Sequence, residues 1–86
     1  MSLEQELVAL VQRYLAAQVS FEELAAWEND HETDLLELGP QSIGGQLAGA
    51  ISITEWEIRS GERANDSARK AIAEDFAEIV GSRSLP

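Results

Sequence analysis

The densest group of side chains that could do chemistry is an acidic run around the only histidine, His31. Acids alternate with other residues on both sides of it: Asp30, Glu32 and Asp34. This alternation is typical of a calcium-binding loop, but Leu35 takes the place of the turn-forming glycine and Gln41 the place of the bidentate glutamate. We therefore expect a solvated acidic loop and no metal site.

The other motifs tested for catalysis also fail. No serine lies in a Gly-x-Ser-x-Gly elbow. The glycines Gly44, Gly45 and Gly49 form neither a dinucleotide fingerprint nor a phosphate loop, because no Gly-Lys-Ser/Thr follows them. The short chain also has little room for a cleft that could hold a catalytic carboxylate pair. We expect a protein that is not an enzyme and that has no cofactor.

The charge distribution bears on the kind of partner. The chain of 86 residues has 16 acidic and 6 basic residues, and its net charge is −10. Residues 1–38 contain nine acids and one base, Arg13, so this half carries −8. Such a charge disfavours nucleic acid and anionic membranes, which attract clustered lysine and arginine. It fits a basic protein partner, although acidity could also serve only solubility.

Cysteine usage and hydropathy bear on class and location. The chain has no cysteine, which excludes disulfides, thiolate zinc sites and a cysteine nucleophile. The acidic N-terminus is unlike a signal peptide. The longest uncharged run, 38–54, is too short and too polar to span a bilayer. We expect a cytoplasmic protein.

Hydrophobic spacing and capping signals predict two helices in the first third of the chain. Apolar residues from Leu3 to Leu15 repeat with helical spacing, and Ser2 with Gln5 forms a capping box. A helix is predicted over about 3–17. Ser20 with Glu23 forms a second box, which predicts a helix over 21–30.

The rest of the chain predicts further helices. A short helix over 34–38 would end at Gly39 and Pro40. The spacing favours one helix over about 40–60 with Pro40 near its first turn. Two helices broken at a third capping box beginning at Ser52, or a strand over 50–58, stay open as alternatives. The last helix would start near Asn65 and stop at Gly81.

These elements predict an all-α fold, an antiparallel helical bundle of about four helices. One helical domain would occupy residues 1–81. Residues 82–86 would form a flexible C-terminal tail.

Two surfaces are candidates for association. The first combines a tryptophan, a type enriched at interface hot spots, with the acids beside it. Its residues are Trp27, Glu28, Asp30, Glu32, Asp34 and Glu37. The second is a face of small residues, typical of tight helix packing or of a dimer seam: Gly45, Ala48 and Gly49. The alternative for Trp27, and the same for Trp56, is that each completes the core.

The segment Leu10–Leu24 reads LVQRYLAAQVSFEEL and resembles the opening of small bacterial immunity proteins of the colicin D type. The likeness rests on Tyr14-Leu15, the short gap to Val19-Ser20 and the helix that starts at Phe21. This resemblance implies a helical cytoplasmic antidote that binds a toxin.

Two functions therefore remain open. The chain is either an acidic protein-interaction module, with an immunity or antitoxin-like role against a basic partner, or a homodimeric structural or regulatory subunit. Electrostatic steering and an aromatic anchor would serve the first. The small-residue face would serve the second.

Overall fold

The computed structural model describes residues 2–84, with backbone alone at 65 and 82–84. It contains five helices: α1 Leu3–Leu15, α2 Phe21–Asp30, α3 Glu32–Glu37, α4 Ile43–Arg59 and α5 Asn65–Ser84. The described residues include no strand. The predicted all-α bundle is confirmed, with the short helix α3 added to four longer ones.

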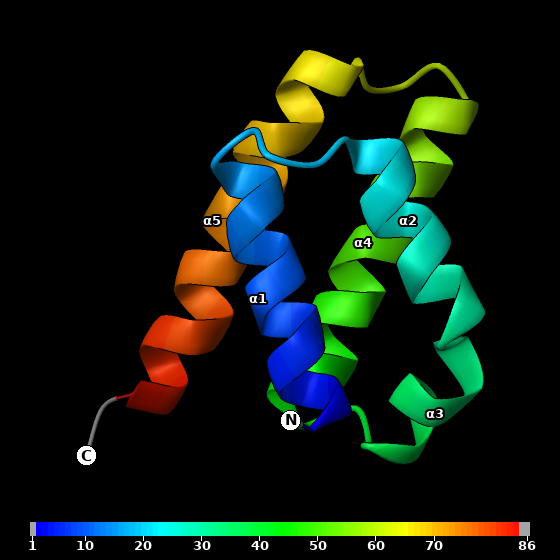
Figure 1. Cartoon of the computed structure of the whole chain (residues 1–86). Coiled ribbons are helices and arrows are strands. Elements are labelled where there is room, and N and C mark those ends of the chain that lie inside the picture. Colours follow the sequence, from blue (N-terminus) through cyan, green and yellow to red (C-terminus); the bar gives the residue numbers. More distant parts are fainter. Residues whose placement is uncertain (1, 85–86) are drawn as a thin grey trace.

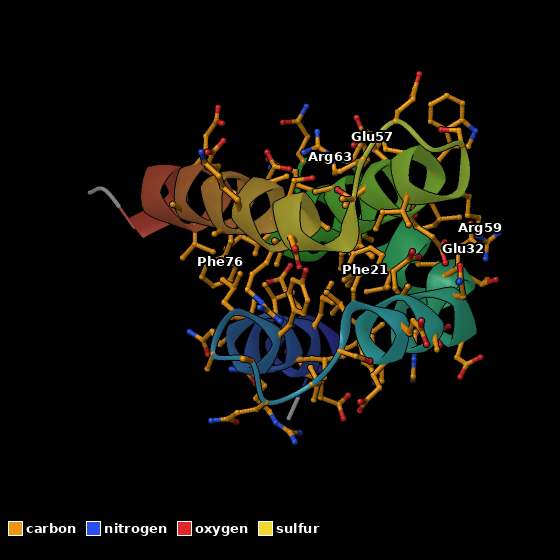
Figure 2. The ribbon with its side chains drawn as sticks, turned by 90° about the horizontal axis from the view of Figure 1, so that it is seen from above. Phe21, Glu32, Glu57, Arg59, Arg63 and Phe76 are labelled. Carbon is orange, nitrogen blue, oxygen red and sulfur yellow. The ribbon has the colours of Figure 1, made fainter. Side chains whose placement is uncertain are left out.

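The four longer helices run alternately up and down. Figure 1 shows α1 and α4 running in one direction, α2 and α5 in the other, and α3 at the end where α2 turns back into α4. Seen from above, α1 and α2 form one layer and α4 and α5 the other, with Phe21 and Phe76 between them (Figure 2). Helix α4 contacts each of the other four helices. It is therefore the helix against which the others are positioned.

Both predicted capping boxes at the start of the chain are confirmed. The Gln5 N–H donates to Ser2 Oγ at 3.1 Å, and the Ser2 N–H donates to Gln5 Oε1 at 3.1 Å. The Glu23 N–H donates to Ser20 Oγ at 3.1 Å in the same way. Each box satisfies backbone donors that a helix N-terminus leaves free, which fixes where α1 and α2 begin.

Helix α1 ends two residues before its predicted boundary. Ala17 has a φ of +63°, in the left-handed region that glycine occupies more readily. The Gln18 N–H then donates to the Arg13 carbonyl at 2.8 Å, which closes the end of the helix. The sequence offers no glycine here, so hydrophobic spacing alone extended the predicted helix too far.

The start of α4 also differs from the prediction. Pro40 lies in the preceding turn, and Ser42 caps the helix by accepting a 2.9 Å hydrogen bond from the Gly45 N–H. The Glu4 carboxylate of α1 accepts a 2.9 Å hydrogen bond from the Gly44 N–H. Two side chains thus satisfy the first free donors of α4, and proline is not needed in its first turn.

Helix α4 continues unbroken from Ile43 to Arg59, which rejects both a break at Ser52 and a strand over 50–58. Gly39 and Gly61 have φ values of +89° and +80°, and they follow the ends of α3 and α4 as predicted. Helix α5 passes through Gly81, its predicted stop, and reaches Ser84. Residues 82–84 of the predicted tail are thus helical, and residues 85 and 86 lie outside the described residues.

The core lies between the two layers. It contains the predicted apolar stripes of the helices. Its buried members are Leu7, Val11, Tyr14, Val19, Phe21, Leu24, Ala25, Leu35, Leu47, Ile51, Ala68 and Ile72. The Tyr14 and Phe21 rings meet edge to face, with centroids 5.8 Å apart, which joins α1 to α2.

Candidate functional site: an acidic pocket between α2, α3 and α4

A close approach of backbones builds one wall of the site. A Cβ atom at Gly45 would collide with the carbonyl oxygen of Gly39, in the turn after α3. The Ser42 hydroxyl donates to the same oxygen at 2.8 Å. Only glycine at position 45 lets this turn lie directly against α4. The absence of a side chain there therefore determines how closely α3 approaches α4.

The same arrangement leaves a pocket of about 200 Å³ beside α4. Helix α4 lines it with small residues, Ala48, Gly49 and Ser52 among them. Helix α3 contributes Leu35 and Leu36. Because α4 has no long side chain at this point, the space between α3 and α4 is only partly filled.

Glu28 of α2 lines this pocket and is 1% exposed. Its Oε1 accepts a 2.8 Å hydrogen bond from the Ser52 hydroxyl. Burial raises the pKa of the Glu28 carboxyl, the bond from Ser52 lowers it, and the negative charges of Glu32 and Glu55 raise it. The sequence predicts Glu28 on an acidic surface. It lies instead in the interior, because it continues the buried stripe of α2.

Glu28 has no cationic partner within the described residues. The ion pairs found there join Arg59 to Glu55 at 3.3 Å and Arg63 to Glu57 at 2.9 Å. Figure 2 shows Glu57 and Arg63 on the outer side of the α4–α5 layer. A buried carboxyl without a cation is uncommon, since buried charges are normally paired.

The other predicted acids are exposed, on the last residue of α2 and along α3: Asp30, Glu32, Asp34 and Glu37. The expected acidic loop is therefore mostly helical, and His31 alone separates the two helices. Glu32 also lines the pocket. None of them forms an ion pair within residues 2–84. The structure thus gathers these acids at one end of the bundle, where none of them is paired with a described cation.

Trp27 and His31 form a second feature of this turn. Their rings stack with centroids 4.1 Å apart, and His31 Nδ1 lies 2.8 Å from the Trp27 carbonyl oxygen. Trp27 is partly buried and packs against the core. In the described part of the chain, no three histidine or carboxylate side chains are grouped so that they could hold a metal ion.

Trp56 does not complete the core, one of the two alternatives for it. It is 61% exposed, on the outer face of α4 with Ile53, which is 63% exposed. The buried stripe of α4 runs through Leu47, Ile51 and Thr54. Trp56 falls on the opposite side of the helix, because it lies five residues from Ile51 at 100° per residue.

The predicted small-residue face divides into two parts. Gly45 is used within the chain against Gly39, and Ala48 packs partly against the core. A Cβ at Gly49 would meet nothing within 4 Å. Of the predicted dimer face, Gly49 alone has open space around its Cβ position.

Sequence reasoning missed two residues of the site, Ser52 and Leu36. The sequence offers Ser52 as a possible helix cap, whereas its hydroxyl donates a hydrogen bond to Glu28 of α2. Leu36 is 73% exposed at the pocket. Neither residue has a clear signal in the sequence. The burial of Glu28 does have one, because Glu28 follows Phe21 and Leu24 by seven and four residues, which places all three on one helical face.

Comparison of the chain with protein-family models, with curated proteins and with solved structures finds no match. Among the helices described, none combines the length and the apolar composition that crossing a membrane requires.

Proposed function

We propose that this chain is a small acidic interaction module that binds a basic protein partner through the turn between α2 and α3. One observation carries the proposal: the exposed acids at the end of α2 and on α3 form no ion pair with a described residue, and Glu32 lines a pocket together with the exposed Leu36. Uncompensated charge speeds the encounter with an oppositely charged surface. The exposed Leu36 supplies apolar area that a partner can bury.

An immunity or antitoxin-like role is one form of this proposal. The resemblance of Leu10–Leu24 to immunity proteins of the colicin D type supports it. In this role the module would cover the basic site of a toxin and so neutralise it. The carboxylates around α3 would compete with the toxin's own anionic substrate.

The test starts with capture of partners from the source organism at low salt, elution in a salt gradient and identification by mass spectrometry. The purified partner is then titrated by calorimetry against two triple variants that remove equal charge. The site variant carries Asp30→Asn, Asp34→Asn and Glu37→Gln. The control carries Asp66→Asn, Glu74→Gln and Glu78→Gln, whose parent side chains are exposed on α5.

We expect a basic partner whose affinity falls steeply with salt and falls at least about tenfold further in the site variant than in the control. Equal losses in the two variants would show that net charge alone attracts the partner. That result, or affinity that does not change with salt, would contradict the proposed surface.

A homodimer is the second candidate, and the outer face of α4 favours it. Ile53 and Trp56 are exposed there beside the open position at Gly49. Sedimentation of the parent and of Trp56→Ser over a range of concentrations tests this function. Concentration-dependent dimers that Trp56→Ser abolishes would support it, and a monomer at all concentrations would exclude it.

A further inference from the structure

The pocket beside α4 combines two properties that together select a ligand. Its walls include apolar side chains of α3 and small residues of α4, and its interior holds the carboxyl group of Glu28. A long basic side chain has the complementary construction, with an apolar stem and a charged head. The volume of about 200 Å³ is below the roughly 300–1,000 Å³ of sites for drug-sized ligands, and it suits a single side chain.

The charges around Glu28 also favour a cationic ligand. Glu32 and Glu55 are the neighbouring charges that act on it, and both are negative. Glu55 is already bonded to Arg59, whereas Glu32 lines the pocket and has no ion-pair partner among the described residues. A cation that entered the pocket would meet two carboxylates without displacing one of the chain's own ion pairs.

We propose that this pocket receives an extended basic side chain of the partner, with its cationic head at Glu28 and Glu32 and its stem between Leu35, Leu36 and Ala48. The inference rests on the proposed function and deepens it, because it specifies what the partner inserts. Among basic residues arginine is favoured, since its planar, weakly hydrated guanidinium suits paired carboxylates at an interface. The Ser52 hydroxyl, already bonded to Glu28, holds that carboxyl in place.

The first experiment uses small probes in place of the partner. The labelled protein is titrated with n-butylguanidinium, which mimics an arginine side chain, and with n-butylurea, its neutral analogue, while backbone and methyl resonances are followed by NMR. We expect saturable shifts confined to residues lining the pocket with the cation. The neutral analogue should bind at least about tenfold more weakly.

Two variants of equal charge separate the pocket from the general acidity of the chain. Glu28→Gln keeps the shape of the side chain and its capacity to accept from Ser52, and we expect it to weaken n-butylguanidinium binding at least about tenfold. Glu22→Gln removes an exposed charge from the same helix and should change binding less than about twofold. Equal effects of the two variants, or equal binding of both probes, would overturn the inference.

Thermal unfolding shows whether each variant is folded, and a third variant leaves the charge untouched. Ala48→Leu adds volume to the wall of the pocket while keeping Glu28. It should reduce n-butylguanidinium binding by at least about tenfold. Parent-like affinity in this folded variant would show that the cation binds elsewhere and would also overturn the inference.

The partner separates failure of this inference from failure of the proposed function. Suppose that the partner binds with the expected salt dependence but that Glu28→Gln weakens its binding no more than Glu22→Gln does. The proposal that the partner inserts a side chain is then wrong, and the proposed acidic binding surface is supported. If n-butylguanidinium occupies the pocket but no basic protein binds, the chemistry of the pocket stands and the proposed function is wrong.

Discussion

Helix α4 packs against α5 on one side and against α2 and α3 on the other, and the residues that make the two contacts differ. Toward α5, its contacts involve buried aliphatic residues, and on the outer side of this layer Glu57 pairs with Arg63 of the loop between the two helices. Toward α2 and α3, the contact depends on glycine, a single buried leucine of α3 and a carboxyl without a cation. Both sides leave hollows at the surface, and those between α4 and α5 include Asp75 in their lining. Only the pocket toward α2 and α3 is lined by a fully buried carboxyl, that of Glu28, which forms no ion pair with a described residue.

The largest expected effect comes from removing the one buried side chain of α3. Leu35→Ala should lower the free energy of unfolding by about 2–5 kcal/mol, because Leu35 is fully buried and α3 has no other such anchor. Urea unfolding measures the loss. Hydrogen exchange should show α3 opening more than α5, and equal protection of both helices would contradict the difference between the two sides.

The next effect tests the close approach of the turn to α4. Gly45→Ala should lower stability by about 1–3 kcal/mol, because the added Cβ meets the Gly39 carbonyl oxygen. Gly49→Ala is the matched control on the same helix, where the new methyl meets nothing. It should raise stability by up to about 1 kcal/mol through helix propensity. Changes of the same sign in both variants would contradict the proposed contact.

These positions also show how far the sequence could be interpreted. Capping residues placed the starts of α1 and α2 correctly, because this signal depends on neighbours within one helix. The role of Gly45 depends on the Gly39 carbonyl, which only the folded chain brings near, so the sequence could not separate Gly45 from Gly49. Ser42 was missed as a cap because Pro40 also fits a helix start.

In the site, too, local properties could be predicted from the sequence, whereas tertiary contacts could not. The exposure of Asp30, Asp34 and Glu37 follows from the general preference of carboxylates for water and could be predicted. The burial of Glu28 overrides the general preference of glutamate for water, and its cause, packing against α4 with a bond from Ser52, is tertiary. Trp56 is the reverse case: a large apolar residue is exposed because helical geometry turns it away from the core.

A smaller effect is expected in the pH dependence of stability. A carboxyl whose pKa is raised in the folded protein holds its proton more tightly there, so ionising it costs stability as pH rises. The stability of the parent relative to Glu28→Gln should therefore fall from pH 4 to pH 7. Burial and nearby acids also raise the pKa of Asp75, so some dependence will remain in the variant. A difference that is constant with pH would contradict the burial of a titrating Glu28.

The smallest effect concerns salt. A chain of charge −10 with most of that charge in one half repels itself, and added ions screen the repulsion. The melting temperature should rise modestly between 0.05 and 0.5 M sodium chloride, as followed by circular dichroism. A fall would show that the ion pairs Arg59–Glu55 and Arg63–Glu57 outweigh the uncompensated acids.

The central claim is that Glu28, on the α2–α3 side of α4, is a buried carboxyl that is paired with none of the described cations. A pH titration of its side-chain carboxyl carbon by ¹³C NMR tests it most directly, with the signal assigned by its loss in Glu28→Gln. The account predicts a midpoint above the ordinary glutamate value of about 4.3. A midpoint at or below that value would mean that the carboxyl is solvated or already paired with a cation, and it would contradict the account.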